Sequence, residues 1–363
     1  MWYISMLNIN KLEIMRNKKY SYYLQVIFVI SLFLTALSSC QFDELAEDCE
    51  EKGLIILNLG VDGMSTRAAG DQLFAGDEAI TKVRIFVFVG DALEVNRLYS
   101  IGESQFNNPF VLEVATGLKD IYVVANESGA LSTELASVTS KSQLTELMVG
   151  QTLSPLNLPL IMTGSESGVN VIEQLEPLHN NVDISLTRVA AKISMRFKKD
   201  TDANVSITKI SLLKNSENTT LWDNGAITSD ITKWDWNHIL TTPLVLTSTA
   251  TAVSGHENIY LFENLAGELN KDKATQLEVE ALYNGIQTKY RVYINEDISS
   301  PGTGNSGDPD YSDVGIKTHY YNIWRNYHYQ LTGTISGIGE YTSISVEVKI
   351  LPWTVHEYAE PLQ

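Results

Sequence analysis

Alternation of apolar and polar residues narrows the fold of this chain more than any other feature, and it is clearest in residues 277–294. Two alternating runs there flank Asn284-Gly285, and Asn-Gly between such runs predicts a two-residue β-hairpin turn. Counting outward from the turn gives three cross-strand pairs: Tyr283 with Ile286, Glu280 with Lys289 and Glu278 with Arg291. Two of these pairs join opposite charges, which stabilises antiparallel pairing. Turn chemistry and cross-strand charge therefore predict the same hairpin.

Strand-like segments fill most of the remaining chain. Short apolar runs rich in β-branched residues are typical of buried strands, and they occur at residues 54–59, 83–89 and 121–125. Alternation in residues 321–335 and 344–350, around a turn at 336–339, predicts a second hairpin. Residues 130–149 instead carry apolar side chains at steps of three and four, which predicts a short helix with a break near Ser140. The sequence thus predicts an all-β fold with a short helix in its first half.

A change of phase marks the middle of the chain. In residues 182–197 the apolar positions switch parity near Thr187-Arg188, so one strand cannot keep one face in one core throughout. A β-bulge explains such a switch, and so does a chain that leaves one sandwich and enters another. Because roughly 320 residues fit two domains better than one, we expect two tandem β-sandwich domains, at residues 54–187 and 188–363.

The N-terminal segment has the order of regions found in a secretory signal. Basic residues precede an apolar run at residues 24–37, and Ser38-Ser39-Cys40 follows it. The run is about fourteen residues long, whereas a helix that spans a bilayer needs roughly twenty. We therefore expect a signal peptide at residues 1–39, with Met15 a better start than Met1 because the basic residues follow it at once.

The residues that end the signal resemble the lipobox of bacterial lipoproteins, in which a cysteine after small residues is acylated and becomes the mature N-terminus. This resemblance implies lipid attachment at Cys40. The acidic stretch at residues 40–53 predicts a solvated tether. It is also similar to the export signals that send lipoproteins of Bacteroidetes to the outer face of the outer membrane. Cys49 lies in this tether and is expected to be an incidental thiol.

Composition excludes several classes of function. The chain has 26 Lys and Arg residues against 44 Asp and Glu residues, and its formal charge of −18 repels phosphate backbones, so nucleic acid is not an expected partner. Two cysteines and six dispersed histidines give no short metal-ligand spacing. We therefore expect neither a metal centre nor another cofactor.

Catalytic motifs are incomplete in this chain. Residues 302–307 match G-x-G-x-x-G, yet Asp308-Pro309-Asp310 follows where a phosphate-binding loop should open a helix. Asp308, Asp310 and Asp313 could offer oxygens to calcium, but the loop lacks the Gly and final Glu of an EF-hand. Glu166 stands where the nucleophile elbow G-x-S-x-G has its serine. No enzyme activity is predicted.

Several short motifs follow one another in a particular order: residues 80–88, 121–126, 186–193, 259–264 and 325–329, and finally Pro352-Trp353. In this order, and with the lipobox before them, they resemble the major fimbrial subunit family of Bacteroidetes, the fimbrilins or type V pilins. The resemblance extends over most of the chain after the signal. It implies two transthyretin-like β-sandwiches, a lipoprotein on the cell outer membrane, and assembly into fimbriae that support adhesion.

The resemblance also implies how such a subunit assembles. In stalk members of the family an Arg-specific protease cuts after the first strand, and the matching bond here is Arg67-Ala68. The loss of a strand leaves unpaired backbone groups and empty apolar pockets, which a strand from another fimbrial subunit can fill. The donor is expected in residues 344–363, with apolar residues in one row and an aromatic residue after them: Ile344, Val346, Val348, Ile350 and Trp353. Residues 344–351 fit equally well as the last strand of their own domain, which would leave the tail beyond Trp353 as the donor.

Three roles remain open at this point. The chain is a polymerising subunit, an anchor or tip subunit that keeps its lipid, or a surface lipoprotein that binds glycans or host proteins. Retained lipid and an intact Arg67-Ala68 bond would favour the anchor. A cleft with exposed aromatic residues would favour glycan binding, with Trp222, Trp234 and Trp236 as candidates, although packing inside a sandwich is the simpler interpretation of these three side chains.

Overall fold

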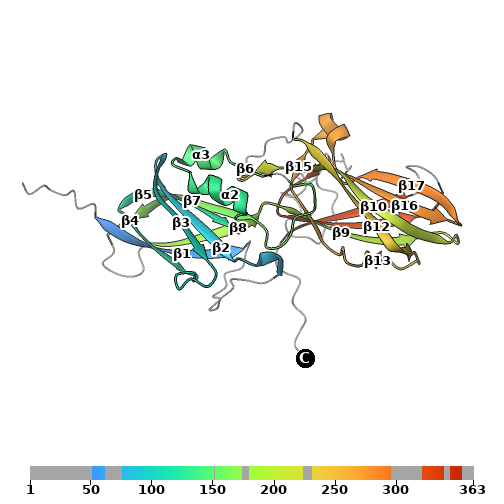
Figure 1. Ribbon diagram of the computed structural model, residues 1–363, viewed down its shortest axis with the longest axis horizontal. Helices are drawn as coiled ribbons and strands as arrows, with labels where there is room; N and C mark the ends of the chain where they lie inside the picture. The colour runs from blue at the N-terminus through green and yellow to red at the C-terminus, as the bar shows by residue number, and fades with distance from the viewer. Residues whose placement is uncertain are drawn as a thin grey trace, which may run out of the picture. The chain divides into compact units, whose positions relative to one another are not determined.

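The computed structural model of the chain describes residues 51–61, 76–150, 152–173, 180–223, 231–295, 321–338 and 344–353. The first part contains these elements: β1 (Lys52–Val61), η1 (Gly76–Glu78), β2 (Lys82–Val89), β3 (Ala92–Ser100), β4 (Phe110–Ala115), β5 (Gly117–Ala125), α2 (Gly129–Ala136), α3 (Lys141–Thr145), β6 (Met148–Val149), β7 (Met162–Val171) and β8 (Asn181–Arg188). The second part contains β9 (Ala191–Lys199), β10 (Val205–Ser216), β11 (Thr219–Thr220), β12 (Lys233–Val245), β13 (Thr251–Ala252), β14 (Ile259–Leu261), β15 (Asn264–Leu265), η2 (Glu268–Lys273), β16 (Gln276–Tyr283), β17 (Ile286–Tyr293), β18 (Asn322–Ile323), β19 (Tyr327–Ile335) and β20 (Ile344–Pro352). The predicted all-β fold is confirmed (Figure 1).

The first sandwich is built from one seven-stranded sheet in the order β3-β2-β5-β7-β8-β1-β4. Every strand of this sheet contributes buried side chains to one common core. Strand β2 is buried on both faces: Val83, Ile85 and Val87 join that core, whereas Phe86 and Phe88 pack under the two helices. The continuous apolar run of β2 follows from this double burial.

Two helices occupy the segment for which one helix with a break was predicted. Helix α2 buries Leu131 and Leu135, and α3 buries Leu144. The break falls at Ser140, whose hydroxyl oxygen accepts a hydrogen bond from the Gln143 N–H and caps α3. The predicted helical segment extends too far toward residue 149, because Met148 is exposed on the short strand β6, which pairs with β11.

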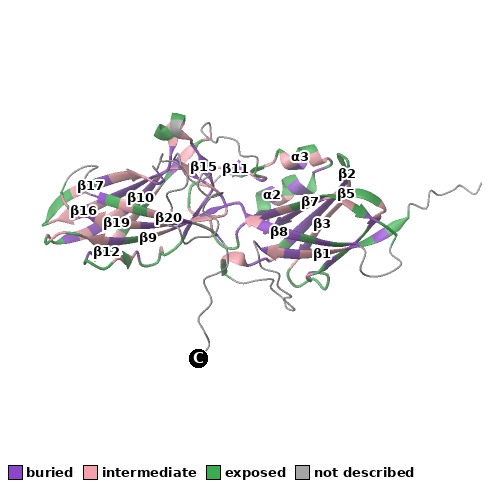
Figure 2. Ribbon diagram, turned by 180° about the vertical axis from the view of Figure 1, so that it is seen from behind, coloured by how far each residue is buried: buried purple, intermediate pink, exposed green. Residues whose placement is uncertain are grey.

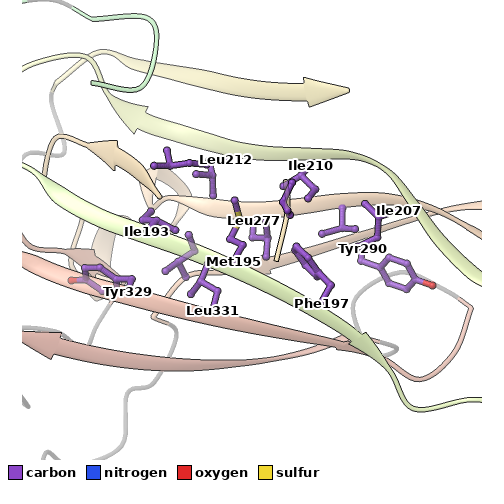
Figure 3. Packing of buried hydrophobic residues seen from close by; sticks show 14 of the residues in the cluster. Ile193, Met195, Phe197, Ile207, Ile210, Leu212, Leu277, Tyr290, Tyr329 and Leu331 are labelled. Carbon is purple, nitrogen blue, oxygen red and sulfur yellow. The ribbon is translucent and has the colours of Figure 1, made fainter. Parts of the chain in front are cut away.

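The second sandwich has two facing sheets. One is four-stranded with the order β12-β10-β16-β17, and the other is five-stranded and includes β13-β9-β19-β20, with β14 also paired to β9. Side chains from β9 and β19 meet side chains from β10, β16 and β17 in one apolar core, as Figure 3 shows. The parity change at Thr187-Arg188 lies where the chain leaves β8 of the first sheet and enters β9 of the second sandwich.

The hairpin of β16 and β17 has the predicted register. Tyr283 lies opposite Ile286, and the two charged pairs follow as expected, Glu280 opposite Lys289 and Glu278 opposite Arg291. The Glu278 carboxylate is mostly buried; burial alone would raise its pKa, but hydrogen bonds from Arg291 and Lys289 outweigh that effect and lower it. The charges thus stabilise the register that the turn sets.

The second predicted hairpin is confirmed for β19 and β20, with Ile335 opposite Ile344 and Tyr329 opposite Ile350. Its first strand, however, begins at Tyr327 and not at Tyr321. Tyr321 and Asn326 both have positive φ, and such backbone breaks a strand. Residues 322–323 form β18 instead, which pairs with β15.

We expect Gly285→Val to lower the free energy of unfolding of the second sandwich by about 1–2 kcal/mol, because φ is +81° at Gly285 and a β-branched residue is strained there. An added Cβ meets no atom within 4 Å, so the cost comes from the backbone alone. Urea denaturation followed by tryptophan fluorescence, to which the buried Trp234 of the second core contributes, measures the change. Gly285→Asn is the matched control, because asparagine adopts positive φ at a smaller cost than a β-branched residue; equal midpoints for Gly285→Val and the unsubstituted protein would contradict the turn assignment.

Candidate functional site

Strand β1 lies inside the seven-stranded sheet and not at its edge. It pairs antiparallel with β4 and parallel with β8, so that Leu57 lies opposite both Phe110 and Val182. Among the described strands, β4 is joined to the sheet through β1 alone. Removal of β1 would therefore leave two strands with unpaired backbone groups.

One face of β1 carries four aliphatic side chains, which we call the anchor row: Ile55, Leu57, Leu59 and Val61. None of the four is more than 2% exposed, and all belong to the core of the first sandwich. Side chains of the opposite face, such as Leu54, point away from that core, and Leu54 is exposed. The buried residues of β1 are drawn purple in Figure 2.

The backbone of β1 is held by a side chain where the pairing with β4 ends. The Asn108 side-chain amide donates to the Leu59 carbonyl oxygen at 2.8 Å, and its oxygen accepts from the Leu59 N–H at 2.9 Å. The amide thus replaces the next residue of a neighbouring strand. This double contact fixes the position of β1 along its length.

The start of β1 passes close to other backbone. A Cβ added to Gly53 would lie 2.6 Å from the Ile172 carbonyl oxygen and 2.7 Å from Cγ1 of Val171. The Asn180 side chain bonds to both the N–H and the carbonyl oxygen of Ile172, at 3.2 and 2.9 Å. Only a residue without a side chain fits at this point of the strand.

The predicted processing bond lies just after this strand in the sequence. Arg67 and Ala68 fall in residues 62–75, outside the described residues, between the end of β1 and the start of η1 at Gly76. Cys40, with the rest of residues 1–50, is also outside the described part. Both assignments stay predictions.

The proposed donor residues form the last described strand, β20. Ile344 and Ile350 are buried, and Val346 and Val348 pack half-buried against the same core. Strand β20 pairs with β19, which pairs in turn with β9, and the three strands lie side by side in Figure 2. Trp353 follows this strand and is 4% exposed, whereas the tail beyond it lies outside the described residues. In the single chain, residues 344–352 thus complete their own sheet.

The three candidate tryptophans for glycan binding do not gather in a cleft. Trp234 is buried in the second core, and Trp222 packs edge-on against Tyr122 at 4.9 Å between ring centroids. Trp236 stacks on His238 at 5.7 Å. The structure therefore assigns these rings to packing.

Histidines and acidic residues form no metal centre among the residues that the structure describes. His238 and His256 lie with ring centroids 3.9 Å apart, and burial followed by the His256 charge lowers the pKa of His238. Asp308, Asp310 and Asp313, the calcium candidates, lie outside the described residues. No helix within the described ranges is long and apolar enough to cross a membrane.

The sequence patterns did not indicate that Asn108 and Gly53 help to position β1. Asn108 lies in Asn107-Asn108-Pro109, which is typical of a turn, and Gly53 stands at the border of an acidic stretch. A glycine two positions before an alternating apolar run is the one local signal that could have pointed to a close backbone approach.

Comparison with known proteins agrees with this geometry. Residues 55–209 match the family model of the major fimbrial subunit protein (FimA). The chain is 31% identical over 339 residues to the major fimbrium subunit FimC of Porphyromonas gingivalis, an alignment that covers 91% of this chain and 69% of that protein.

Solved structures share the fold. A fimbrilin (FimA) from Porphyromonas gingivalis W83 is similar at a TM-score of 0.56 with 18% identity, over 84% of this chain and 98% of that one. The tip fimbrial protein Mfa3 from Porphyromonas gingivalis is similar at a TM-score of 0.50 with 17% identity, over 83% of this chain and 100% of that one. Sequence and fold agree, and the chain belongs to the family of major fimbrial subunit proteins.

Proposed function

We propose that this chain is a structural subunit of cell-surface fimbriae that supports adhesion and polymerises by replacement of its first strand. The observation that carries the proposal is the interior position of β1, held by the anchor row on one face and by two neighbouring strands at its sides. Assembly by strand replacement needs a strand whose departure leaves a vacancy of defined shape. No catalytic role and no cofactor are part of the proposal.

Cleavage by an Arg-specific protease after Arg67 would separate β1 from the rest of the chain. Burial of four aliphatic side chains contributes about 6–12 kcal/mol, at roughly 1.5–3 kcal/mol each. A whole domain is stable by only about 5–15 kcal/mol. A subunit that has lost β1 is therefore strongly driven to accept another strand.

The incoming strand is expected to come from the C-terminal segment of a neighbouring subunit. Residues 344–350 offer four apolar side chains at alternate positions, the same number and spacing as the anchor row. In that alignment Thr342 takes the place of Gly53, where Ile172 and Val171 leave no space for a side chain. The donor strand can therefore follow the path of β1 from Ile344 onward, whereas the residues before Ile344 must take another path. If β20 stays in its own sheet, the tail beyond Trp353 is the donor.

Lipid attachment at Cys40 is proposed to hold the subunit at the outer membrane before assembly. We expect Cys40→Ala to abolish acylation and delivery to the cell surface, because the thiol is the group that lipid modification requires. Labelling cells with a radioactive fatty acid measures acylation, and surface immunofluorescence measures delivery. Cys49→Ala is the matched control and should leave both unchanged. Unaltered lipid incorporation in the Cys40→Ala protein would contradict the lipoprotein assignment.

The experiment that tests the proposed function follows the size of the purified precursor by light scattering before and after treatment with an Arg-specific protease. Polymers should appear only after treatment. A precursor that is cleaved at Arg67-Ala68 and stays monomeric would contradict a stalk role and favour the anchor or tip role. An uncleaved protein that keeps its lipid on the cell surface would favour the anchor.

A further inference from the structure

The end of β20 is fastened by several contacts around one residue. The Trp353 N–H donates to the Asn326 carbonyl oxygen at 3.0 Å, and the Trp353 carbonyl oxygen accepts from Nη1 of Arg188 at 3.0 Å. The ten residues after Trp353 form the C-terminal tail. The last described residue before the tail is thus bonded through its backbone on both sides.

The indole ring of Trp353 is enclosed as well. It stacks on the Tyr260 ring at 5.7 Å with an interplanar angle of 7°. The Arg188 guanidinium carbon lies 4.4 Å from the indole ring centroid, and Nζ of Lys192 lies 5.5 Å from it. Two cations therefore lie within reach of the negative face of this ring.

Two acidic residues hold these cations in place. Glu78 bonds to Arg188 at 2.9 Å, and Asp77 bonds to Lys192 at 2.7 Å. Asp77 also accepts a hydrogen bond from the Tyr260 hydroxyl, and burial together with this bond raises the pKa of Tyr260. Because the Arg188 side chain is fully buried, loss of the Glu78 charge weakens the position of a cation that cannot turn to solvent.

The position of these contacts in the chain matters for assembly. Asp77 and Glu78 belong to η1, which begins nine residues after Arg67, so they stay with the subunit after cleavage at Arg67-Ala68. Cleavage allows β1 to leave its place between β4 and β8, which we call the seat of β1, but it leaves the contacts around Trp353 intact. Among the described strands β20 pairs with β19 alone, so the contacts around Trp353 add to the burial of Ile344 and Ile350 in holding this strand.

We propose that Asp77, Glu78, Arg188, Lys192 and Tyr260 form a latch around Trp353, and that opening of this latch sets the rate at which the C-terminal segment becomes available to a neighbouring subunit. This proposal rests on the proposed strand replacement. Assembly then has two separate requirements, an empty seat on one subunit and an open latch on the next. The latch delays polymerisation of subunits that have already been cleaved.

The test uses the full-length, uncleaved chain and two isosteric variants, Glu78→Gln and Asp77→Asn, which lie outside the donor segment. Hydrogen exchange of residues 344–352 should be faster by about tenfold in each variant, while exchange of β2 and β16 is unchanged. Glu347→Gln is the matched control, because this exposed side chain on β20 is not one of the latch residues. Unchanged exchange in β20, or equal acceleration in all strands, would overturn the latch.

A second readout separates the latch from the proposed function. After cleavage, the Glu78→Gln and Asp77→Asn proteins should polymerise several-fold faster than the unsubstituted protein, with similar final polymer lengths. Equal or slower polymerisation of these variants would overturn the latch and leave strand replacement standing. Failure of every cleaved protein to polymerise would overturn the proposed function, and the exchange measurement on the uncleaved chain would still decide on the latch. Trp353→Phe, which keeps a ring over Tyr260, should show an intermediate exchange rate.

Discussion

Arg67→Ala is expected to abolish protease-dependent assembly of the purified subunit. An Arg-specific protease needs the guanidinium on the residue before the cut bond, so the alanine variant keeps β1 joined to the chain. The joined strand stays between β4 and β8, with Leu57 paired to both, so an incoming strand would have to break both pairings before it could enter. Light scattering and native electrophoresis of the protease-treated protein measure the loss of polymers.

Controls separate loss of cleavage from damage to the fold. Arg67→Lys keeps the positive charge but not the guanidinium, so it should behave as Arg67→Ala does. Arg97→Lys changes an arginine on β3 whose guanidinium lies over the Tyr99 ring, and it should polymerise normally after protease treatment. Polymers formed by cleavage-resistant Arg67→Ala would refute processing-dependent assembly, since the seat of β1 would then not need to be vacated.

The elements that could be predicted from the sequence are those set by local chemistry. The hairpin at Asn284-Gly285 was predicted with its register because the turn and the charged pairs lie within a few residues of each other. The break near Ser140 could likewise be predicted because a serine that caps a helix acts on the next three residues. In both cases neighbouring residues in the sequence decide the structure.

The features that hold β1 depend on contacts between distant parts of the chain. Asn58 of β1 bonds to Asp183 of β8, 125 residues away, and neither residue indicates this partner in the sequence. The position of Trp353 likewise depends on contacts with Arg188 and Tyr260. Periodicity predicts that these two residues belong to strands, but it does not indicate which residues they contact at the strand ends. An alternating pattern predicts that a strand exists and which face is buried, but not which strands flank it.

The same limit explains why the sequence alone does not identify the donor strand. Residues 344–350 and the anchor row have the same alternation, so the sequence alone cannot distinguish a strand that completes its own sheet from one that fills another. The structure adds an asymmetry between them: β1 is flanked on both sides, whereas β20 pairs with β19 alone among the described strands. A strand held on one side is the easier of the two to release.

Gly53→Ala should destabilise the first sandwich by about 2–4 kcal/mol, a large effect for one methyl group. The new Cβ would lie 2.6 Å from the Ile172 carbonyl oxygen, which accepts a hydrogen bond from the Asn180 amide, while the Ile172 N–H donates to the Asn180 side-chain oxygen; together the two bonds keep this residue in place. The strand must therefore move away from β7, which pulls the anchor row out of its pockets. Hydrogen exchange of β1, β4 and β8 in the uncleaved chain measures the change without the assumption that both sandwiches unfold together.

Gly129→Ala is the matched control for that variant. Gly129 begins α2, its added Cβ meets no atom within 4 Å, and alanine favours the helix, so stability should stay the same or rise slightly. After cleavage, Gly53→Ala should also release the β1 peptide faster than the unsubstituted protein, because the strain is present only while β1 occupies its seat. Mass spectrometry of the cleaved protein measures that release. Equal exchange rates and equal release for Gly53→Ala and Gly129→Ala would show that β1 does not pass Ile172 closely. In that case the incoming strand could also carry a side chain at the position of Gly53.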